Sequence, residues 1–199
     1  PRIVVAALIG DPAANAVHVI DPMSGNLLFT ITDPRVGNFG AALASDGGIR
    51  LAVGAPTWSN TVPPGITTGY VNLYKLNGGG AAQAATFSPT PLTTSREFGR
   101  SLANVGDLDG DSLDDFAVLC PSATASSAFA AIVSARSSAI SGTFAYAFPT
   151  ASGQGRVAAM GDIDGDDRSD VMFSGGGNLQ VATTPAGGAL TPLPAANTT

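Results

Sequence analysis

One layout recurs three times along this chain, and the repeat restricts the fold more than any other feature of the sequence. The copies open at Phe39, Phe98 and Gln154, each followed by glycine, so they start 59 and 56 residues apart. Each continues through a turn-forming or acidic stretch into a short apolar run. A repeat of this length suits one four-stranded blade of a β-propeller with generous loops.

Four blocks of alternating residues indicate β-strands with one buried face. They read AVHVID, YVNLYK, FAAIVS and NLQVAT, at 16–21, 70–75, 129–134 and 178–183. Their second and fourth positions are apolar in every copy, and a period of two is the side-chain period of a strand. The positions expected to be buried are Val17, Val19, Val71, Leu73, Ala130, Ile132, Leu179 and Val181.

Shorter apolar runs precede these blocks at 50–53, 115–118 and 170–173, and the run at 2–5 fills the same place before the first block. No stretch has helical periodicity. We therefore predict an all-β fold of four-stranded antiparallel meanders, which are β-propeller blades. Three full blades plus most of a fourth are expected, as part of a larger propeller whose remaining strands come from elsewhere. The predicted units are 1–36, 37–95, 96–152 and 153–199.

The composition supports this fold class and excludes several functions. The chain has 25 glycines, 14 prolines and only 12% charged residues, which is typical of a turn-rich β-protein. With a net charge of −6 and Lys75 as the only lysine, it has no basic patch for nucleic acid. The longest apolar stretch, 3–9, is far short of the roughly 20 residues of a membrane helix. The lone Cys120 is expected to be a small buried strand residue.

Two acidic loops carry the strongest chemical signal. They span 107–115 (DLDGDSLDD) and 162–170 (DIDGDDRSD), with aspartate at positions 1, 3, 5 and 9 and glycine at position 4. Two like charges about 4 Å apart repel by roughly 4 kcal/mol at an effective dielectric constant of about 20, so such clusters favour a bound cation. The predicted ligands are the side chains of Asp107, Asp109, Asp111, Asp115, Asp162, Asp164, Asp166 and Asp170, and the carbonyls of Leu113 and Arg168.

Calcium fits these loops better than other metals. It accepts about six to eight oxygen ligands, whereas magnesium demands a stricter octahedron and zinc prefers histidine or cysteine. An EF-hand is excluded because position 12 holds Val118 and Phe173 instead of glutamate. The alternative of a merely acidic, solvated hairpin is less favoured, since both loops keep one register. We expect two calcium ions and no third, because the stretch 45–48 is too short and too neutral.

The motifs together resemble the FG-GAP repeats of integrin α-subunit propellers and their relatives. Phe39-Gly40 with Gly54-Ala55-Pro56 supplies both halves of that name, and GDLDGDSLDDFAVLCP places the acidic loop between them. The resemblance covers nearly the whole chain and implies that the loop joins the first two strands of a blade. The last two copies depart from the Gly-Ala-Pro half, with 120–122 reading CPS and 174–176 reading SGG. Family propellers usually carry seven blades.

The resemblance implies a calcium-binding extracellular or cell-surface module for adhesion or structural assembly. Its partner would be another protein or the remainder of a longer chain. We also expect the chain not to be an enzyme, because one histidine (His18) and one cysteine offer no nucleophile–base pairing. Weak calcium sites, with dissociation constants on the order of 10⁻⁴–10⁻³ M, fill only outside the cytosol.

The face opposite the calcium loops is expected to bind the partner. It carries the long connection 57–69, which contains Trp58. The alternative is a carbohydrate-binding, lectin-like propeller in which Trp58 stacks on a sugar; a third interpretation is that Trp58 only plugs the blade. Asn197 begins a glycosylation sequon.

Overall fold

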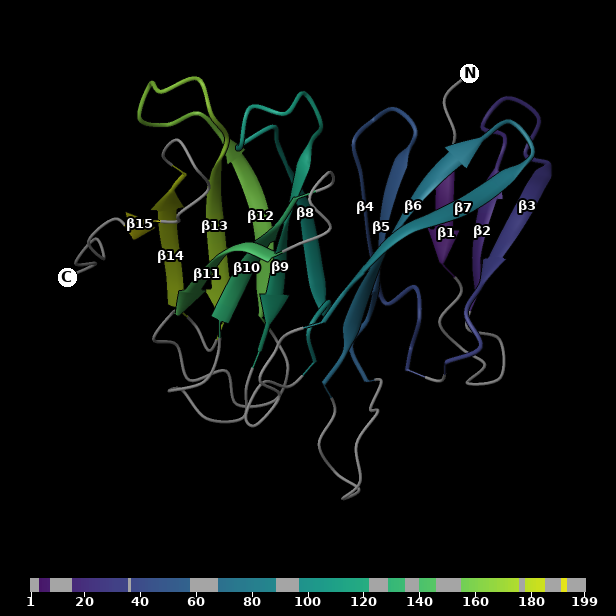
Figure 1. Cartoon of the computed structure of the whole chain (residues 1–199), viewed down its shortest axis with the longest axis horizontal. Coiled ribbons are helices and arrows are strands. Elements are labelled where there is room, and N and C mark those ends of the chain that lie inside the picture. Colours follow the sequence, from purple (N-terminus) through teal and green to yellow (C-terminus); the bar gives the residue numbers. More distant parts are fainter. Residues whose placement is uncertain are drawn as a thin grey trace.

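The structure, a computed structural model, describes residues 4–7, 16–35, 37–57, 68–88, 97–121, 129–134, 140–145, 155–175, 178–184 and 191–192. These residues form four antiparallel sheets and no helix (Figure 1). In every sheet the strands pair in chain order, so each sheet is a meander. The all-β prediction is confirmed.

The first sheet has three strands and the other three sheets have four. The strands are β1 (Val4–Ala7), β2 (Ala16–Ile20) and β3 (Leu27–Thr32); β4 (Ala42–Ser45), β5 (Arg50–Ala55), β6 (Tyr70–Asn77) and β7 (Gly80–Phe87); β8 (Ser101–Gly106), β9 (Asp115–Cys120), β10 (Phe129–Val133) and β11 (Ile140–Ala145); and β12 (Arg156–Gly161), β13 (Asp170–Gly175), β14 (Asn178–Thr183) and β15 (Thr191–Pro192). We number the four sheets as blades 1 to 4.

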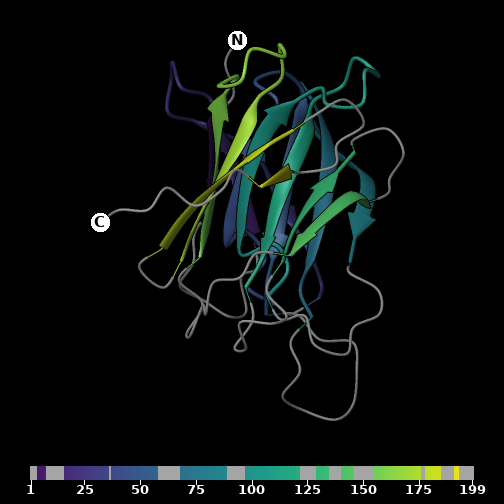
Figure 2. The same ribbon diagram turned by 90° about the vertical axis from the view of Figure 1, so that its left-hand side faces the viewer.

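The blades are arranged as in a propeller. Their first strands β4, β8 and β12 lie next to one another, and the later strands of each blade extend away from them. Seen from the blade 4 end, the sheets lie one behind another (Figure 2). Blade 1 begins with β1, which pairs with β2 as β5 pairs with β6, so β1 occupies a second-strand position. The β-propeller prediction is therefore confirmed, while the exact blade boundaries stay a prediction.

Three apolar clusters hold neighbouring blades together, one at each junction. Alternate residues of β10 face opposite neighbours: Ala130 and Ile132 pack with blade 4, and Ala131 and Val133 pack with blade 2. The third cluster joins blades 1 and 2 through residues such as Val17 and Tyr74. A central blade is thus buried on both faces, which explains why its strands read as nearly continuous apolar runs. Cys120 is fully buried in the junction of blades 2 and 3, as predicted.

The predicted burial is wrong for blade 4. The second and fourth positions of the alternating blocks are buried in blades 1 to 3, but Leu179 is 58% exposed and Val181 is half-buried. In the other blades these positions pack on the blade that follows in the chain. Within the described residues no sheet follows blade 4, so this face meets solvent and Ala182, on the opposite face, is buried instead.

The Phe-Gly pair and the Gly-Ala-Pro triplet contact each other. Gly40 and Gly99 both have positive φ (91° and 87°), and their amides donate to the carbonyls of Gly54 (2.9 Å) and Leu119 (3.2 Å), which are equivalent positions. A side chain on Gly54 would also overlap the carbonyl oxygen of Gly99, which begins the next blade. Glycine is needed at 54 because two backbones meet there.

Among the described residues there is no helix long and apolar enough to cross a membrane.

Candidate metal sites

The two acidic loops occupy equivalent places in blades 3 and 4. The first connects β8 to β9 and the second connects β12 to β13, so each joins the first two strands of its blade as expected. Both loops lie at the same end of the molecule, the upper end in Figure 1, together with the β4–β5 connection. The fold therefore presents them as a repeated structural feature.

The two loops also have the same backbone conformation. Position 4 is glycine with a φ of 81° at Gly110 and 86° at Gly165. Position 6 is left-handed in both loops although it is not glycine, with a φ of 68° at Ser112 and 65° at Asp167. Since this conformation costs an ordinary residue roughly 1–2 kcal/mol, its presence at the same place in both loops indicates one shared, tightly specified turn.

The first aspartate of each loop is held by three main-chain amides. Asp107 Oδ1 accepts from Gly110 (2.7 Å) and Asp111 (3.0 Å), and its Oδ2 accepts from Ser112 (2.7 Å). Asp162 accepts from the three equivalent amides at 2.6, 3.2 and 2.8 Å. These bonds hold the pKa of Asp162 below its usual value, and at Asp107 they outweigh the burial that acts to raise it.

The later aspartates repeat the same pattern. At position 5, Asp111 and Asp166 accept from the amide of position 7 at 2.8 and 3.0 Å. At position 9, Asp115 and Asp170 accept from the amide of position 2 at 3.1 and 2.8 Å, and both are fully buried. The carboxylates of both loops are thus oriented by the turn itself.

Each loop brings three carboxylates close enough to hold one metal ion. In each trio, ligand oxygens lie within 4.8 Å of one another: Asp107, Asp109 and Asp115 in the first loop, and Asp162, Asp164 and Asp166 in the second. Each trio holds three of the four aspartates predicted for its loop.

Two of the predicted aspartates fall outside these trios, as do the two predicted carbonyl ligands. Asp111 is not part of the first trio, and Asp170 is not part of the second. The two carboxylate oxygens of Asp170 instead accept hydrogen bonds from the amides of Thr184 (3.1 Å) and Ile163 (2.8 Å). At position 7, Leu113 and Arg168 contact the position 5 carboxylate through their amides. Their carbonyls stay predicted ligands.

The carboxylates at the centre of the second loop repel one another. Desolvation by the surrounding loop, together with the charges of Asp166 and Asp170, raises the pKa of the exposed Asp164. A bound cation would remove this repulsion, because its charge opposes that of all the clustered carboxylates at once.

The β4–β5 connection of blade 2 is built differently. Its single carboxylate, Asp46, accepts from the amides of Gly48 (2.7 Å) and Arg50 (3.0 Å) and lies 3.7 Å from the Arg50 guanidinium. Arg50 occupies the place of Asp115 and Asp170 in the other blades. A positive side chain therefore stands where the acidic loops have a buried aspartate.

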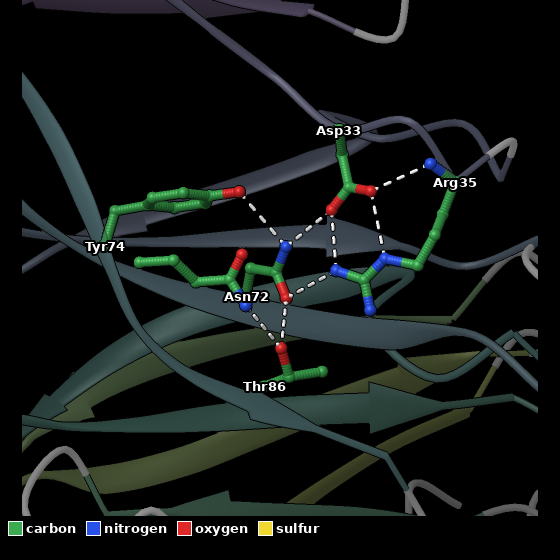
Figure 3. A network of polar contacts seen from close by, with 6 residues as sticks. Asp33, Arg35, Asn72, Tyr74 and Thr86 are labelled. Carbon is green, nitrogen blue, oxygen red and sulfur yellow. Dashed lines mark hydrogen bonds and ion pairs between the residues drawn. The ribbon is translucent and has the colours of Figure 1, made fainter.

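A second polar feature, which the sequence did not reveal, lies between blades 1 and 2 (Figure 3). Asp33, whose side chain is 3% exposed, accepts hydrogen bonds from Arg35 (2.6 and 2.9 Å) and from Asn72 Nδ2 (2.7 Å). The buried Asn72 also bonds to Tyr74 (3.1 Å) and Thr86 (2.7 Å). The one signal in the sequence is Asn72 itself, a polar residue between two buried apolar ones in its strand.

Two predicted residues cannot be placed. Trp58, the candidate ligand-face residue, and Asn197, the candidate glycosylation site, lie outside the described residues.

Comparison with known proteins gives a structural likeness and no family. No family model matches the chain. Among solved structures, the chain is similar to the periplasmic gluconolactonase PpgL of Pseudomonas aeruginosa, with 14% sequence identity and a TM-score of 0.40. The match covers 96% of this chain and 66% of that one, so this chain spans just under two thirds of its length.

The expectation that the chain is not an enzyme is corrected by this comparison. The matched structure is that of a gluconolactonase, which is an enzyme. The shortage of a nucleophile–base pair along the sequence therefore does not exclude catalysis, because catalytic groups can come from loops far apart in the chain.

Proposed function

We propose that this chain is a calcium-binding β-propeller module of the FG-GAP type that serves adhesion or structural assembly outside the cytosol. The observation that carries the proposal is the equivalence of the two acidic loops. They share their position in the blade, their left-handed residues and five equivalent main-chain hydrogen bonds to the carboxylates. Two independent copies of one arrangement favour a common ligand over a chance gathering of acidic residues.

The chemistry of the donors supports calcium. All the clustered groups are carboxylates from one tight turn, and such oxygen donors suit a hard cation that tolerates irregular coordination. Asp107, Asp109 and Asp115 would hold the ion in blade 3, and Asp162, Asp164 and Asp166 would hold it in blade 4. The ion would join the two strands that each loop connects, so its role here is structural. Sites of this kind with weak affinity fill at extracellular calcium concentrations, which is the basis for the proposed location.

The exposed face of blade 4 supports a partner that supplies a further blade. Val105, Leu108 and Ala130 of blade 3 are buried against blade 4. Their equivalents in blade 4 are Met160, Ile163 and Leu179, which are 41%, 46% and 58% exposed. Apolar residues at these positions match an interface between blades, and we propose that the remainder of a longer chain or another protein covers them.

Calorimetry with calcium tests the proposed function. We expect two ions per chain. Asp109→Asn and Asp164→Asn should each remove one site, because each takes a charged oxygen from one trio. The matched control is Asp167→Ser, which gives the second loop the residue found at position 6 of the first and should leave both sites. Absence of calcium binding, or loss of binding in the control alone, would contradict the proposal.

A further inference from the structure

The arginines of the described residues differ in one respect. Four of the five form an ion pair with a carboxylate two to four positions away: Arg35 with Asp33, Arg50 with Asp46, Arg100 with Glu97, and Arg168 with Asp166. The fifth, Arg156, has no carboxylate partner within the described part of the chain, and its Nη1 donates only to the carbonyl of Gly155 (3.0 Å). Among the described arginines, Arg156 is thus the one whose charge no described carboxylate balances.

Arg156 lines a cavity of about 430 Å³ at the ends of the inner strands. The cavity is formed where β4, β8 and β12 begin, whereas the acidic loops leave β8 and β12 at their other ends. Leu43, Pro56 and Leu102 form part of its wall, and polar atoms form the larger share. Its volume lies in the range of about 300–1,000 Å³ that is typical of small-molecule sites.

A second arginine lines the same cavity. Arg100 and Arg156 each follow the glycine that opens their copy in the sequence, and both line the wall. In the strand pairing, Arg156 occupies the position held by Ser101 in blade 3 and by Ala42 in blade 2, so the two arginines come from neighbouring positions of the repeat. Arg100 is paired with Glu97 at 3.2 Å, whereas no carboxylate of the described residues pairs with Arg156. Only one of the two arginines therefore has a countercharge within the described residues.

We propose that this cavity binds a small organic molecule through a single carboxylate. A guanidinium presents donors in a planar fork that matches the two oxygens of a carboxylate. Two arginines and one glutamate leave one net positive charge at the cavity, which a monoanion neutralises and a dianion does not. Leu43 and Leu102, on adjacent inner strands, would contact the body of the molecule, and the polar part of the wall suits a molecule that carries hydroxyl groups. Arg156 is the primary binding residue and Arg100 the second.

A matched pair of sugars tests the proposal. D-glucuronate and D-glucose share a ring and differ at C6, which is a carboxylate in one and a hydroxymethyl group in the other. Inorganic phosphate at mildly alkaline pH, where it is mostly a dianion, serves as the dianionic probe. Titrations followed by nuclear magnetic resonance, with calcium present throughout, should show saturable binding of glucuronate, weaker binding of phosphate and none of glucose. Arg156→Gln should weaken glucuronate binding at least about tenfold, as expected for a lost charge-assisted hydrogen bond. Lys75→Gln removes one positive charge away from the cavity and should change nothing.

Several outcomes would overturn the proposal. They are equal binding of glucose and glucuronate, tighter binding of phosphate, no saturable binding, or unchanged glucuronate binding in Arg156→Gln. Arg100→Gln, which should weaken binding less, serves as a second variant if Arg156→Gln does not fold. The calcium sites lie at the opposite ends of the strands, so failure here leaves the calcium titration unaffected, and the two proposals fail separately.

Discussion

The aspartates of this molecule are stabilised in two different ways. Asp33 lies between two blades beside the guanidinium of Arg35, and Asp46 lies beside Arg50. The aspartates of the acidic loops instead receive mainly main-chain amides. Amides orient a carboxylate and stabilise its charge but leave that charge in place, whereas arginine cancels it. At the residue scale, this difference separates the structural aspartates from most of those available to a cation; Asp166 has both kinds of contact, since it also lies 3.7 Å from the Arg168 guanidinium.

Asp33 gives a prediction about stability and pH. Burial acts to raise the pKa of Asp33, but its hydrogen bonds and charge interaction with Arg35 outweigh burial and lower it. Replacing Asp33 with asparagine should lower the free energy of unfolding by about 1.5–3 kcal/mol at pH 7, the usual range for hydrogen bonds to a charged group. Urea unfolding measures the loss.

The pH dependence of the same variant has a definite sign. A carboxyl group with a lowered pKa in the folded state stabilises the fold above its unfolded pKa of about 3.9 and loses this effect as the pH falls through the folded value. Asp33→Asn should therefore lose less stability than the parent between about pH 5 and pH 2. Arg35→Gln completes a double-mutant cycle, and a coupling energy near zero would refute the role given to this pair.

At the element scale, the strands of one blade are positioned by the backbone of the next. The amide of Gly99 donates to Leu119 within blade 3, while its carbonyl lies against Gly54 of blade 2. Phe98, just before it, is buried in the cluster shared by blades 2 and 3. The Phe-Gly pair therefore fixes both the start of its own blade and the contact with the preceding one.

Gly54→Ala tests this contact. The added methyl group would overlap the carbonyl oxygen of Gly99, so one backbone must move. Overpacking of this kind typically costs about 1–3 kcal/mol, which in a domain of this size lowers the melting temperature by several degrees. Gly78→Ala is the matched control, because no atom lies within 4 Å of its added methyl group. Equal melting temperatures for the two variants would contradict this account.

The sequence predicted the elements better than the contacts between them. Strand alternation and the acidic loops follow from local patterns of two and nine residues, and both lie where expected. The Asp33–Asn72 hydrogen bond and the shared cavity of Arg100 and Arg156 join residues that are 39 and 56 positions apart. No local pattern encodes such contacts. The exposure of Leu179 was missed for the same reason, since the alternation shows which residues share a face but not whether another blade covers that face.

The exposure of Leu179 gives a second prediction at the element scale. Leu179 and Ala130 hold the same position in their blades, but Ala130 is fully buried and Leu179 is 58% exposed. Leu179→Asp should change the free energy of unfolding of this chain by less than about 0.5 kcal/mol, as surface substitutions usually do. Ala130→Asp should cost several kcal/mol, because it places a charge in the junction of blades 3 and 4. Chemical denaturation of both variants measures the difference, and a large loss for Leu179→Asp would show that this face is covered.

On the scale of the whole molecule, each blade is stabilised by its contacts with the neighbouring blades. Each apolar cluster contains residues of two consecutive blades only, so every blade depends directly on its immediate neighbours. Structures built from stacked units behave in this way, with stability close to a sum of unit and interface contributions. The two acidic loops belong to blades 3 and 4, and Leu108 of the first loop is buried in the cluster that joins them.

Calcium removal should therefore affect the blades unequally. A ligand at 100 times its dissociation constant stabilises the folded state by about 2.7 kcal/mol, and chelation removes that contribution. Hydrogen exchange followed by mass spectrometry should show the largest loss of protection in β8, β9, β12 and β13. A smaller loss is expected in β5 and β6, which contact blade 3 through one cluster, and the smallest in β2, which has no direct contact with blade 3 through the described clusters. Asp167→Ser should reproduce this gradient, because its calcium ligands are intact.

A uniform loss across all four blades would mean that the molecule unfolds as one cooperative unit, and no loss in either loop would mean that the loops do not depend on a cation.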